Sequence, residues 1–221
     1  SSYYMSLINN PTYLLNDPVN GDEFEQEDER VLMGGSLDRE DEVEVFGFSA
    51  RSKIGSSLRY DDVQELNLFN TKARQRYASV REDEAQELSL AAYGELEVSV
   101  NERLRVTGGL RVDHVRFDVS ALQPENSGSD NDALVQPKIG AAYRLTDSLE
   151  VYANYGHGFH SNDVRAAVNR IDPITGDATE AQDVLVEGRG GEVGFRYDTL
   201  RGFNVTVTAF ELATDSELVF V

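Results

Sequence analysis

The chain has 221 residues, no cysteine and a net charge of −20. The absence of cysteine excludes a disulfide framework, a zinc-finger cluster and a thiol nucleophile. The acidic balance argues against nucleic acid as a partner, because a phosphate-binding surface needs clustered Lys and Arg. No run of about 18 apolar residues is present that could form a transmembrane helix.

The first third of the chain is the least regular. The acidic run Asp22–Glu29 belongs to a long polar connection expected near Pro18–Glu29. It could bind Ca²⁺ or meet lipopolysaccharide through divalent ions, but it lacks the ligand spacing and central glycine of an EF-hand loop, so a solvated acidic loop is favoured. The run Asp38–Glu42 interrupts any alternation. It is interpreted as a polar, lumen-facing or protruding part of a long strand.

From residue 86 onward, period-two alternation dominates. In Leu104–Val112 every second residue is apolar or Gly, and the residues between them are Arg, Thr or Gly. Leu88–Val100, Leu149–Tyr155 and Phe203–Ala209 show the same pattern. Such alternation predicts strands with one apolar and one polar side.

The connections between these strands alternate in length. Short polar turns are expected near Ser49–Ser52, Asn101–Arg103, Thr146–Ser148 and Asp198–Gly202. Long polar connections are expected near Pro18–Glu29, Asn70–Gln86, Ser120–Leu134 and His160–Arg189. Short periplasmic turns and long extracellular loops are typical of a membrane barrel. We therefore predict an all-β fold, an antiparallel up-and-down transmembrane β-barrel, of which this chain supplies about nine strands.

The alternation also assigns the two faces of the wall. We expect the following residues to point to lipid: Leu104, Val106, Leu110, Leu149, Val151, Val205 and Val207. We expect ion pairs on the lumen side among Arg105, Arg111, Arg144, Arg196, Glu95, Glu97 and Asp113. Alternation from Tyr155 places His160 on the lumen side and His157 toward the outside.

Three segments resemble strands of one protein family. Leu104–Asp113, Gln136–Tyr143 and Leu149–Phe159 are similar, in this order and at natural spacing, to strand motifs of TonB-dependent outer-membrane receptors. The family usually continues after Gly-Phe with a basic residue and a proline, whereas His160-Ser161-Asn162-Asp163-Val164-Arg165 follows here. The cargo specificity of a well-known family member therefore cannot be assigned to this chain.

The resemblance implies a 22-stranded barrel in the cell outer membrane, with an N-terminal plug domain and a contact to TonB. About nine strands cannot close a barrel that leaves room for a plug. We therefore expect residues 1–221 to be part of one β-barrel domain, with the plug and the barrel closure outside this chain. The implied partners are outer-membrane lipid and lipopolysaccharide, the receptor's own plug domain, TonB, and an extracellular small-molecule cargo. No cofactor is expected.

The richest group of polar side chains follows Phe159. His160 and Asp163 are candidate ligands for a metal or a metal chelate, and Asn162 and Arg165 could hydrogen-bond an anionic group of a cargo. The alternative, which is favoured, is that Ser161–Asp163 cap a turn and Arg165 pairs with a neighbour. No nucleophile elbow, phosphate loop or dinucleotide motif is present, so an enzyme is not expected.

The function expected from the resemblance is TonB-energised uptake of a scarce nutrient such as a metal chelate or siderophore. A passive porin or a barrel adhesin is the alternative within membrane barrels. A soluble β-rich binding domain is the third possibility.

Overall fold

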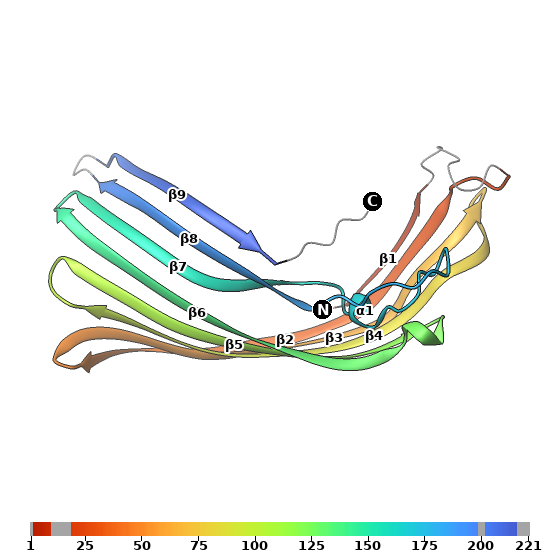
Figure 1. Ribbon diagram of the computed structural model, residues 1–221, viewed down its shortest axis with the longest axis horizontal. Coiled ribbons are helices and arrows are strands. Elements are labelled where there is room, and N and C mark those ends of the chain that lie inside the picture. Colours follow the sequence, from red (N-terminus) through yellow and green to blue (C-terminus); the bar gives the residue numbers. More distant parts are fainter. Residues whose placement is uncertain (1, 10–18, 199–201, 216–221) are drawn as a thin grey trace.

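The computed structural model describes residues 2–9, 19–198 and 202–215, and it forms one curved sheet of nine strands (Figure 1). The elements in chain order are β1 (Ser2–Asn9), β2 (Phe24–Val45), β3 (Phe48–Lys72), β4 (Gln75–Ser99), β5 (Leu104–Ala121), η1 (Pro124–Asn126), β6 (Gly128–Thr146), β7 (Leu149–Ser161), α1 (Val164–Val168), β8 (Leu185–Asp198) and β9 (Asn204–Thr214). Each strand pairs antiparallel with the next in sequence. The predicted antiparallel up-and-down arrangement of about nine strands is confirmed.

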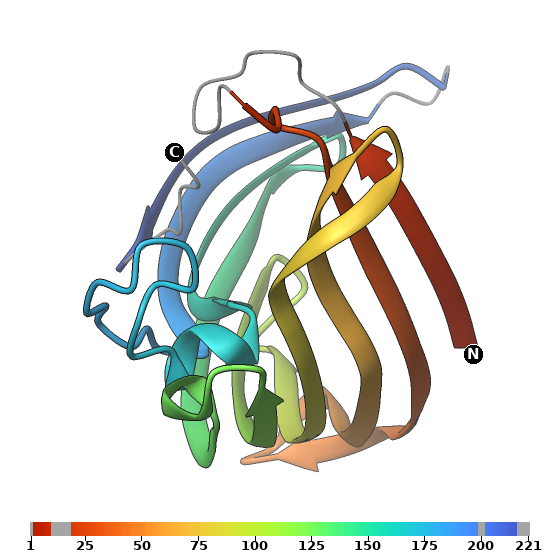
Figure 2. The same ribbon diagram turned by 90° about the vertical axis from the view of Figure 1, so that its right-hand side faces the viewer.

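The sheet bends into a trough, with β1 and β9 on opposite sides of it (Figure 2). Its concave face carries α1 and the long segment between β7 and β8. Within the described residues, no helix is long and apolar enough to cross a membrane.

One end of the sheet, which we call the short-turn end, holds the tight connections predicted from the sequence. Asn101 Oδ1 accepts hydrogen bonds from the backbone N–H groups of Arg103 and Leu104, both at 2.9 Å. The turn between β6 and β7 lies at Asp147–Ser148, as predicted. Of the turn predicted at Asp198–Gly202, residues 199–201 lie outside the described residues. Its flanks are the end of β8 at Asp198 and the start of β9 at Asn204.

The turn expected near Ser49–Ser52 was misplaced. Those residues belong to β3, and the chain reverses at Phe46–Gly47, where both residues have positive φ (53° and 82°). Two consecutive residues with positive φ fit the twist of a two-residue hairpin. The polar side chains of Arg51 and Ser52 gave the false signal, because they lie on strand faces rather than in a turn.

The opposite end, which we call the far end, differs more from the prediction. The long connection expected at Asn70–Gln86 does not exist, because β3 and β4 continue to a two-residue turn at Ala73–Arg74. The acidic segment Asp22–Glu29 is also mostly strand, since β2 begins at Phe24 and pairs with both β1 and β3. Of the connection expected at Ser120–Leu134, only residues 122–127 lie outside strands, including the short η1 helix. These strand ends are rich in charged and polar residues, so their composition resembled that of loops.

In the part of the sheet nearer the short-turn end, strand register separates two faces. Val106 pairs with Val98 and Ala141, and Leu110 pairs with Gly94 and Pro137, so one face is apolar. Arg105, Arg111 and Glu150 lie on the other, concave face. In the Asp38–Glu42 run, Glu40 faces Lys53 on the concave side, whereas Arg39 and Asp41 pair with each other on the apolar side at 2.6 Å.

Candidate functional site on the concave face

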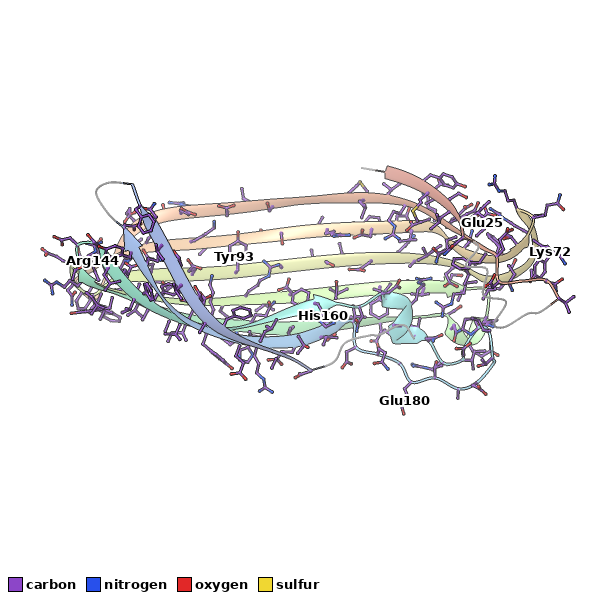
Figure 3. The ribbon with its side chains drawn as sticks, turned by 90° about the horizontal axis from the view of Figure 1, so that it is seen from above. Glu25, Lys72, Tyr93, Arg144, His160 and Glu180 are labelled. Carbon is purple, nitrogen blue, oxygen red and sulfur yellow. The ribbon has the colours of Figure 1, made fainter. Side chains whose placement is uncertain are left out.

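Ion pairs cover the concave face in the part of the sheet nearer the short-turn end. Lys53 pairs with Glu40 at 3.0 Å, and Arg105 and Arg196 both reach Glu150, at 2.8 and 3.2 Å. A second group of pairs joins Arg111 to Asp113 at 2.7 Å and Lys138 to Glu95. Arg144 lies at the short-turn end (Figure 3). The ion pairs predicted on this face are therefore present for most of the residues expected to form them.

Toward the far end the pattern of the two faces inverts. Beyond Asp113, the concave side of β5 carries Val115, Phe117 and Val119, and the opposite side carries His114, Arg116 and Asp118. Val63 of β3 and Ala85 of β4 join this apolar patch. The polar residues on the outer side indicate that this part of the sheet lies beyond the apolar environment that the rest of the outer face meets. The apolar residues on the inner side would be exposed to water unless another segment covered them.

The cover is the segment between β7 and β8. Val164 and Val168 of α1 pack on the apolar patch together with Val184, Leu185 and Phe159. This buried cluster, which we call the mouth core, consists of Val63, Ala85, Val115, Phe117, Val119, Val164, Val168, Val184 and Leu185. Phe117 is only 3% exposed. The long segment predicted at His160–Arg189 thus exists between Ser161 and Leu185, and it folds back onto the inner wall.

Polar contacts hold the cover in place. Asp163 is the N-cap of α1, where its carboxylate accepts from the backbone N–H of Arg165 at 2.9 Å. The Arg165 guanidinium bonds the same carboxylate at 2.7 Å and reaches Asp83 of β4 at 3.1 Å. Burial alone would raise the pKa of Asp163, but the hydrogen bonds and the charge of Arg165 hold that pKa below its ordinary value. Asn126 of η1 also fixes the cover, because its Oδ1 accepts hydrogen bonds from the backbone N–H groups of Arg170 and Ile171, at 2.8 and 3.0 Å.

The four candidate cargo-binding residues therefore differ in their surroundings. The side chains of Asp163 and Arg165 bond each other, and Asn162 Nδ2 donates to the carbonyl of Asp183 at 2.8 Å. These contacts match the turn-capping and pairing alternative. His160 pairs with Val186 along the strand and lines a hollow on the concave face beside α1 (Figure 3). Of the four, His160 is the one that lines this hollow.

The hollow next to His160 has a volume of about 880 Å³. Lys138, Asn154 and Glu192 contribute polar groups to its lining, and Phe210 and Leu212 of β9 contribute apolar ones. Asn154 Nδ2 donates to Glu192 at 2.7 Å. Within the part of the chain that the structure describes, no three His, Asp or Glu side chains gather as a metal site. A metal held here would need further ligands, from the cargo itself or from outside these residues.

His157 was expected to point outward, but it lines a second hollow together with Arg111, Gln136 and Lys138. Its Nδ1 contacts Glu187, and its ring meets Tyr155 edge-on at 5.6 Å. Pairing between β6 and β7 ends at Lys138 and Gly156. Beyond that point β7 continues without β6 as a neighbour, so the strand face that carries Tyr155 and His157 can meet the inner wall instead of the outside.

The mouth core was the feature that sequence reasoning missed. A signal was present, because the alternation of β5 continues past Asp113 with apolar residues on the side that had been polar. Read as a change of surroundings, this inversion predicts an inner apolar patch. The non-local contact from Arg165 to Asp83 has no such signal, since 82 residues separate the two.

Comparison with known proteins gives one family match over the whole chain. The sequence model described as "TonB dependent receptor-like, beta-barrel" matches residues 1–221. The metal-pseudopaline receptor CntO of Pseudomonas aeruginosa (strain UCBPP-PA14) is 28% identical over 123 residues, and the match covers 52% of this chain. This chain spans only 16% of that relative.

Solved structures share the fold at low sequence identity. The unliganded ferric citrate transporter FecA has a TM-score of 0.69 and 15% identity, covering 87% of this chain and 28% of its own. The ferric yersiniabactin uptake receptor FyuA from Yersinia pestis has a TM-score of 0.63 and 20% identity, covering 87% and 30%. FpvA of P. aeruginosa has a TM-score of 0.66 and 19% identity, covering 97% and 29%. The matched proteins are named as receptors or transporters, in agreement with the non-enzymatic function predicted from the sequence.

Proposed function

The chain belongs to the TonB-dependent receptor-like β-barrel family, and on that premise we propose that it is part of an outer-membrane receptor that imports a metal chelate. The apolar face of the sheet would meet lipid, the concave face would line the lumen, and the far end would be extracellular. A plug domain and TonB would complete the transporter, and uptake would be energised through TonB. Names of the matched proteins support a metal chelate as the cargo, since they include a metal-pseudopaline receptor and receptors for ferric complexes.

The observation that carries this proposal is the hollow beside His160. It lies on the concave face and reaches His160, one residue before the end of β7, where the cover begins; the mouth core and the Arg165–Asp83 contact fix that cover. A pocket of several hundred Å³ with apolar walls and a few polar groups is the usual form of a small-molecule site. A passive pore needs width and charge along its lumen, but not a recess that combines apolar side chains with an imidazole and paired polar groups.

Within this proposal His160 contacts the cargo, through either metal coordination or a hydrogen bond. Asn162, Asp163 and Arg165 act indirectly, by fixing the segment that follows His160. Replacing His160 should therefore change cargo binding alone, whereas replacing Asp163 or Arg165 should also loosen the cover.

Growth and metal uptake on a limiting chelate test the function. Cells carrying the full-length receptor should import ⁵⁵Fe from at least one ferric chelate in a panel, and loss of TonB should abolish that import. His160→Ala should weaken uptake about tenfold if it removes one direct contact to the bound complex. Arg144→Ala, at the short-turn end, is the matched control. Import that persists without TonB would favour a passive pore and contradict the proposal.

A further inference from the structure

A charged pair interrupts the apolar outer face of β2. Arg39 and Asp41 lie two residues apart on this strand, so both side chains are on the same face of the sheet. Two contacts join them, because Arg39 Nε lies 2.6 Å from one carboxylate oxygen of Asp41 and Arg39 Nη2 donates to the other at 2.8 Å. Along the same face of β2 their neighbours are Leu37 and Val43, both exposed. We call Arg39 and Asp41 the outer pair.

Strand register places the outer pair inside the apolar face and not at its border. Arg39 pairs with Ile54 of β3. Ile54 pairs with Gly94 of β4, which pairs with Leu110 of β5. At a tilt of about 45°, the seven residues that separate Arg39 from the turn at Phe46 rise roughly 16 Å, within an apolar band about 25 Å tall. The two charges therefore lie at a depth where the rest of the face is apolar.

A charge at this depth needs a polar neighbour. Charged residues on the lipid face destabilise a barrel, most strongly near the bilayer midplane. The contact within the outer pair leaves the side chain of Arg39 74% exposed and that of Asp41 39% exposed. A long Arg side chain can extend toward the lipid headgroups, whereas the short Asp side chain cannot. The carboxylate in particular indicates that something polar covers the pair.

The surface around the outer pair allows a close approach. On the same face, Ser52 lies opposite Asp41, and Ser56 lies opposite Leu37. A Cβ added to Gly35, which also faces outward, would meet no atom of the described residues within 4 Å. Small side chains let two protein surfaces come close together inside a membrane. Another protein surface could thus reach both charges without displacing large side chains.

We propose that the outer pair is the centre of a contact between two copies of this receptor within the membrane. In a two-fold symmetric contact the same residues meet, so each Arg39 lies opposite Asp41 of the second copy and each Asp41 lies opposite its Arg39. The guanidinium has five N–H donors and can serve both carboxylates. Four alternating charges with no net charge result, and they attract strongly where water is excluded. The charge pattern favours a second copy because the outer pair is its own complement, whereas a partner of one sign would leave one charge unmatched.

This contact goes beyond the proposed import and can be separated from it. It rests on the assignment of the apolar face to lipid, but import needs only the lumen of one barrel. Losing the contact should therefore leave uptake of the metal chelate unchanged.

Photo-crosslinking in intact cells tests the contact, with two isoleucines as a matched pair. Ile54 lies beside Arg39, and Ile139 lies three strands away on the same apolar face, about 14 Å across the sheet. Their exposed fractions are 60% and 61%. Each is replaced in turn by p-benzoylphenylalanine in the full-length receptor, the cells are illuminated, and dimers are detected on denaturing gels. Position 54 should give about tenfold more dimer than position 139, because the photoreactive ketone reacts only with groups in contact with it.

Charge exchange then shows whether the outer pair holds the two copies together. With the probe at position 54, Arg39→Asp or Asp41→Arg alone places four like charges in the contact and should lower dimer formation about tenfold. Expressing the two variants together, with different tags, sets two carboxylates against two guanidinium groups and should restore a mixed dimer. Replacing both residues by Leu removes the charges and the cost of exposing them to lipid, so this variant should still insert but lose the dimer. Heat-modifiable migration on gels checks insertion of each variant.

The outcomes that overturn the proposal are distinct. Equal crosslinking from positions 54 and 139 would remove the contact, and a dimer that persists in the double Leu variant would remove the role of the outer pair. Crosslinking from position 54 to another protein alone would replace the second copy by a different partner. Absence of the mixed dimer from two inserted variants would confine the pair to a single barrel. Uptake of ⁵⁵Fe by the double Leu variant should equal that of wild type, and import that is independent of TonB would overturn the proposed function while leaving the contact standing.

Discussion

The two ends of the sheet are built on different principles. At the short-turn end, each reversal is local: Asn101 closes its own turn, and Phe46–Gly47 reverses the chain within two residues. At the far end the turn at Ala73–Arg74 is also local, but contacts between distant segments join the cover and the strand ends, such as Arg165 with Asp83 and Arg76 with Glu25. We therefore expect a substitution in one of the local turns to affect that turn alone, and a substitution in the far-end contacts to loosen several segments together.

This difference predicts where single substitutions matter most. Phe117 and Phe46 are the same residue type in opposite situations, 3% and 97% exposed. Phe117→Ala should lower the free energy of unfolding by about 3–5 kcal/mol, because it leaves a cavity in the mouth core. Phe46→Ala at the short-turn end is the control and should change it by less than about 0.5 kcal/mol. Denaturant unfolding of the full-length receptor in detergent measures both, and equal effects would remove the distinction between the two ends.

In the strands between the two ends, the folding cost of introducing a charge should depend on the face of the sheet that the residue occupies. Val106→Arg places a cation on the apolar face and should cost about 2–4 kcal/mol if the site is near the bilayer midplane. Thr107→Arg, one residue further on, faces the lumen side and should cost far less. Reversible folding into lipid vesicles measures the two costs. Similar values for the two variants would contradict the assignment of faces.

The cover at the far end should loosen in acid. The pKa of Asp163 is held below its ordinary value in the folded state, because Arg165 stabilises the carboxylate against the opposing effect of burial. The contact therefore contributes stability at neutral pH, and this contribution is lost as the pH falls below about 4, the ordinary pKa of Asp, and through the lowered folded value. Protection factors for hydrogen exchange, which are corrected for the effect of pH on the intrinsic exchange rate, should therefore fall in residues 162–184 over that range. Asp163→Asn should remove this fall. A fall that persists would assign it to another group, such as Asp172, whose pKa is also lowered by hydrogen bonds from the backbone of Thr175 and Ile174.

The smallest effect is expected at the short-turn end. Asn101→Ala removes a side chain that accepts two backbone hydrogen bonds, and it should cost about 1 kcal/mol. Glu102→Ala in the same turn is the control and should be neutral. The measurement is the same denaturant unfolding. A loss as large as that of Phe117→Ala would show that this turn is coupled to the far end.

The same contrast explains what the sequence could predict. Alternation and turn chemistry act over a few residues, so the strands from residue 86 onward and the turn at Asn101–Arg103 were predictable. The strands near Asn70–Gln86 were not, because Glu25, Glu27 and Arg76 read as loop residues until strand pairing brings their charges together. The pair of Arg39 and Asp41 on the apolar face also had no local signal, since a charged run fits a lumen face equally well.

For the candidate site, alternation placed His160 on the lumen side but gave His157 the wrong face. The error follows from the end of β6–β7 pairing at Gly156, which the sequence does not mark. The cap role of Asp163 was among the alternatives suggested by its residue type. Its bond network with Arg165 and Asp83 required the fold.

The hairpin of β3 and β4 has a consequence for recognition at the cell surface. Each strand has 25 residues, or about 80 Å of extended chain, which at a tilt of about 45° rises roughly 57 Å, against a hydrocarbon core of about 30 Å. Its tip carries Lys72 and Arg74, two exposed basic side chains on a chain with a net charge of −20. With the far end extracellular, as proposed above, this tip would stand well clear of the bilayer of an intact bacterium as an exposed epitope. Antibodies raised against residues 71–76 should therefore label living cells without permeabilisation.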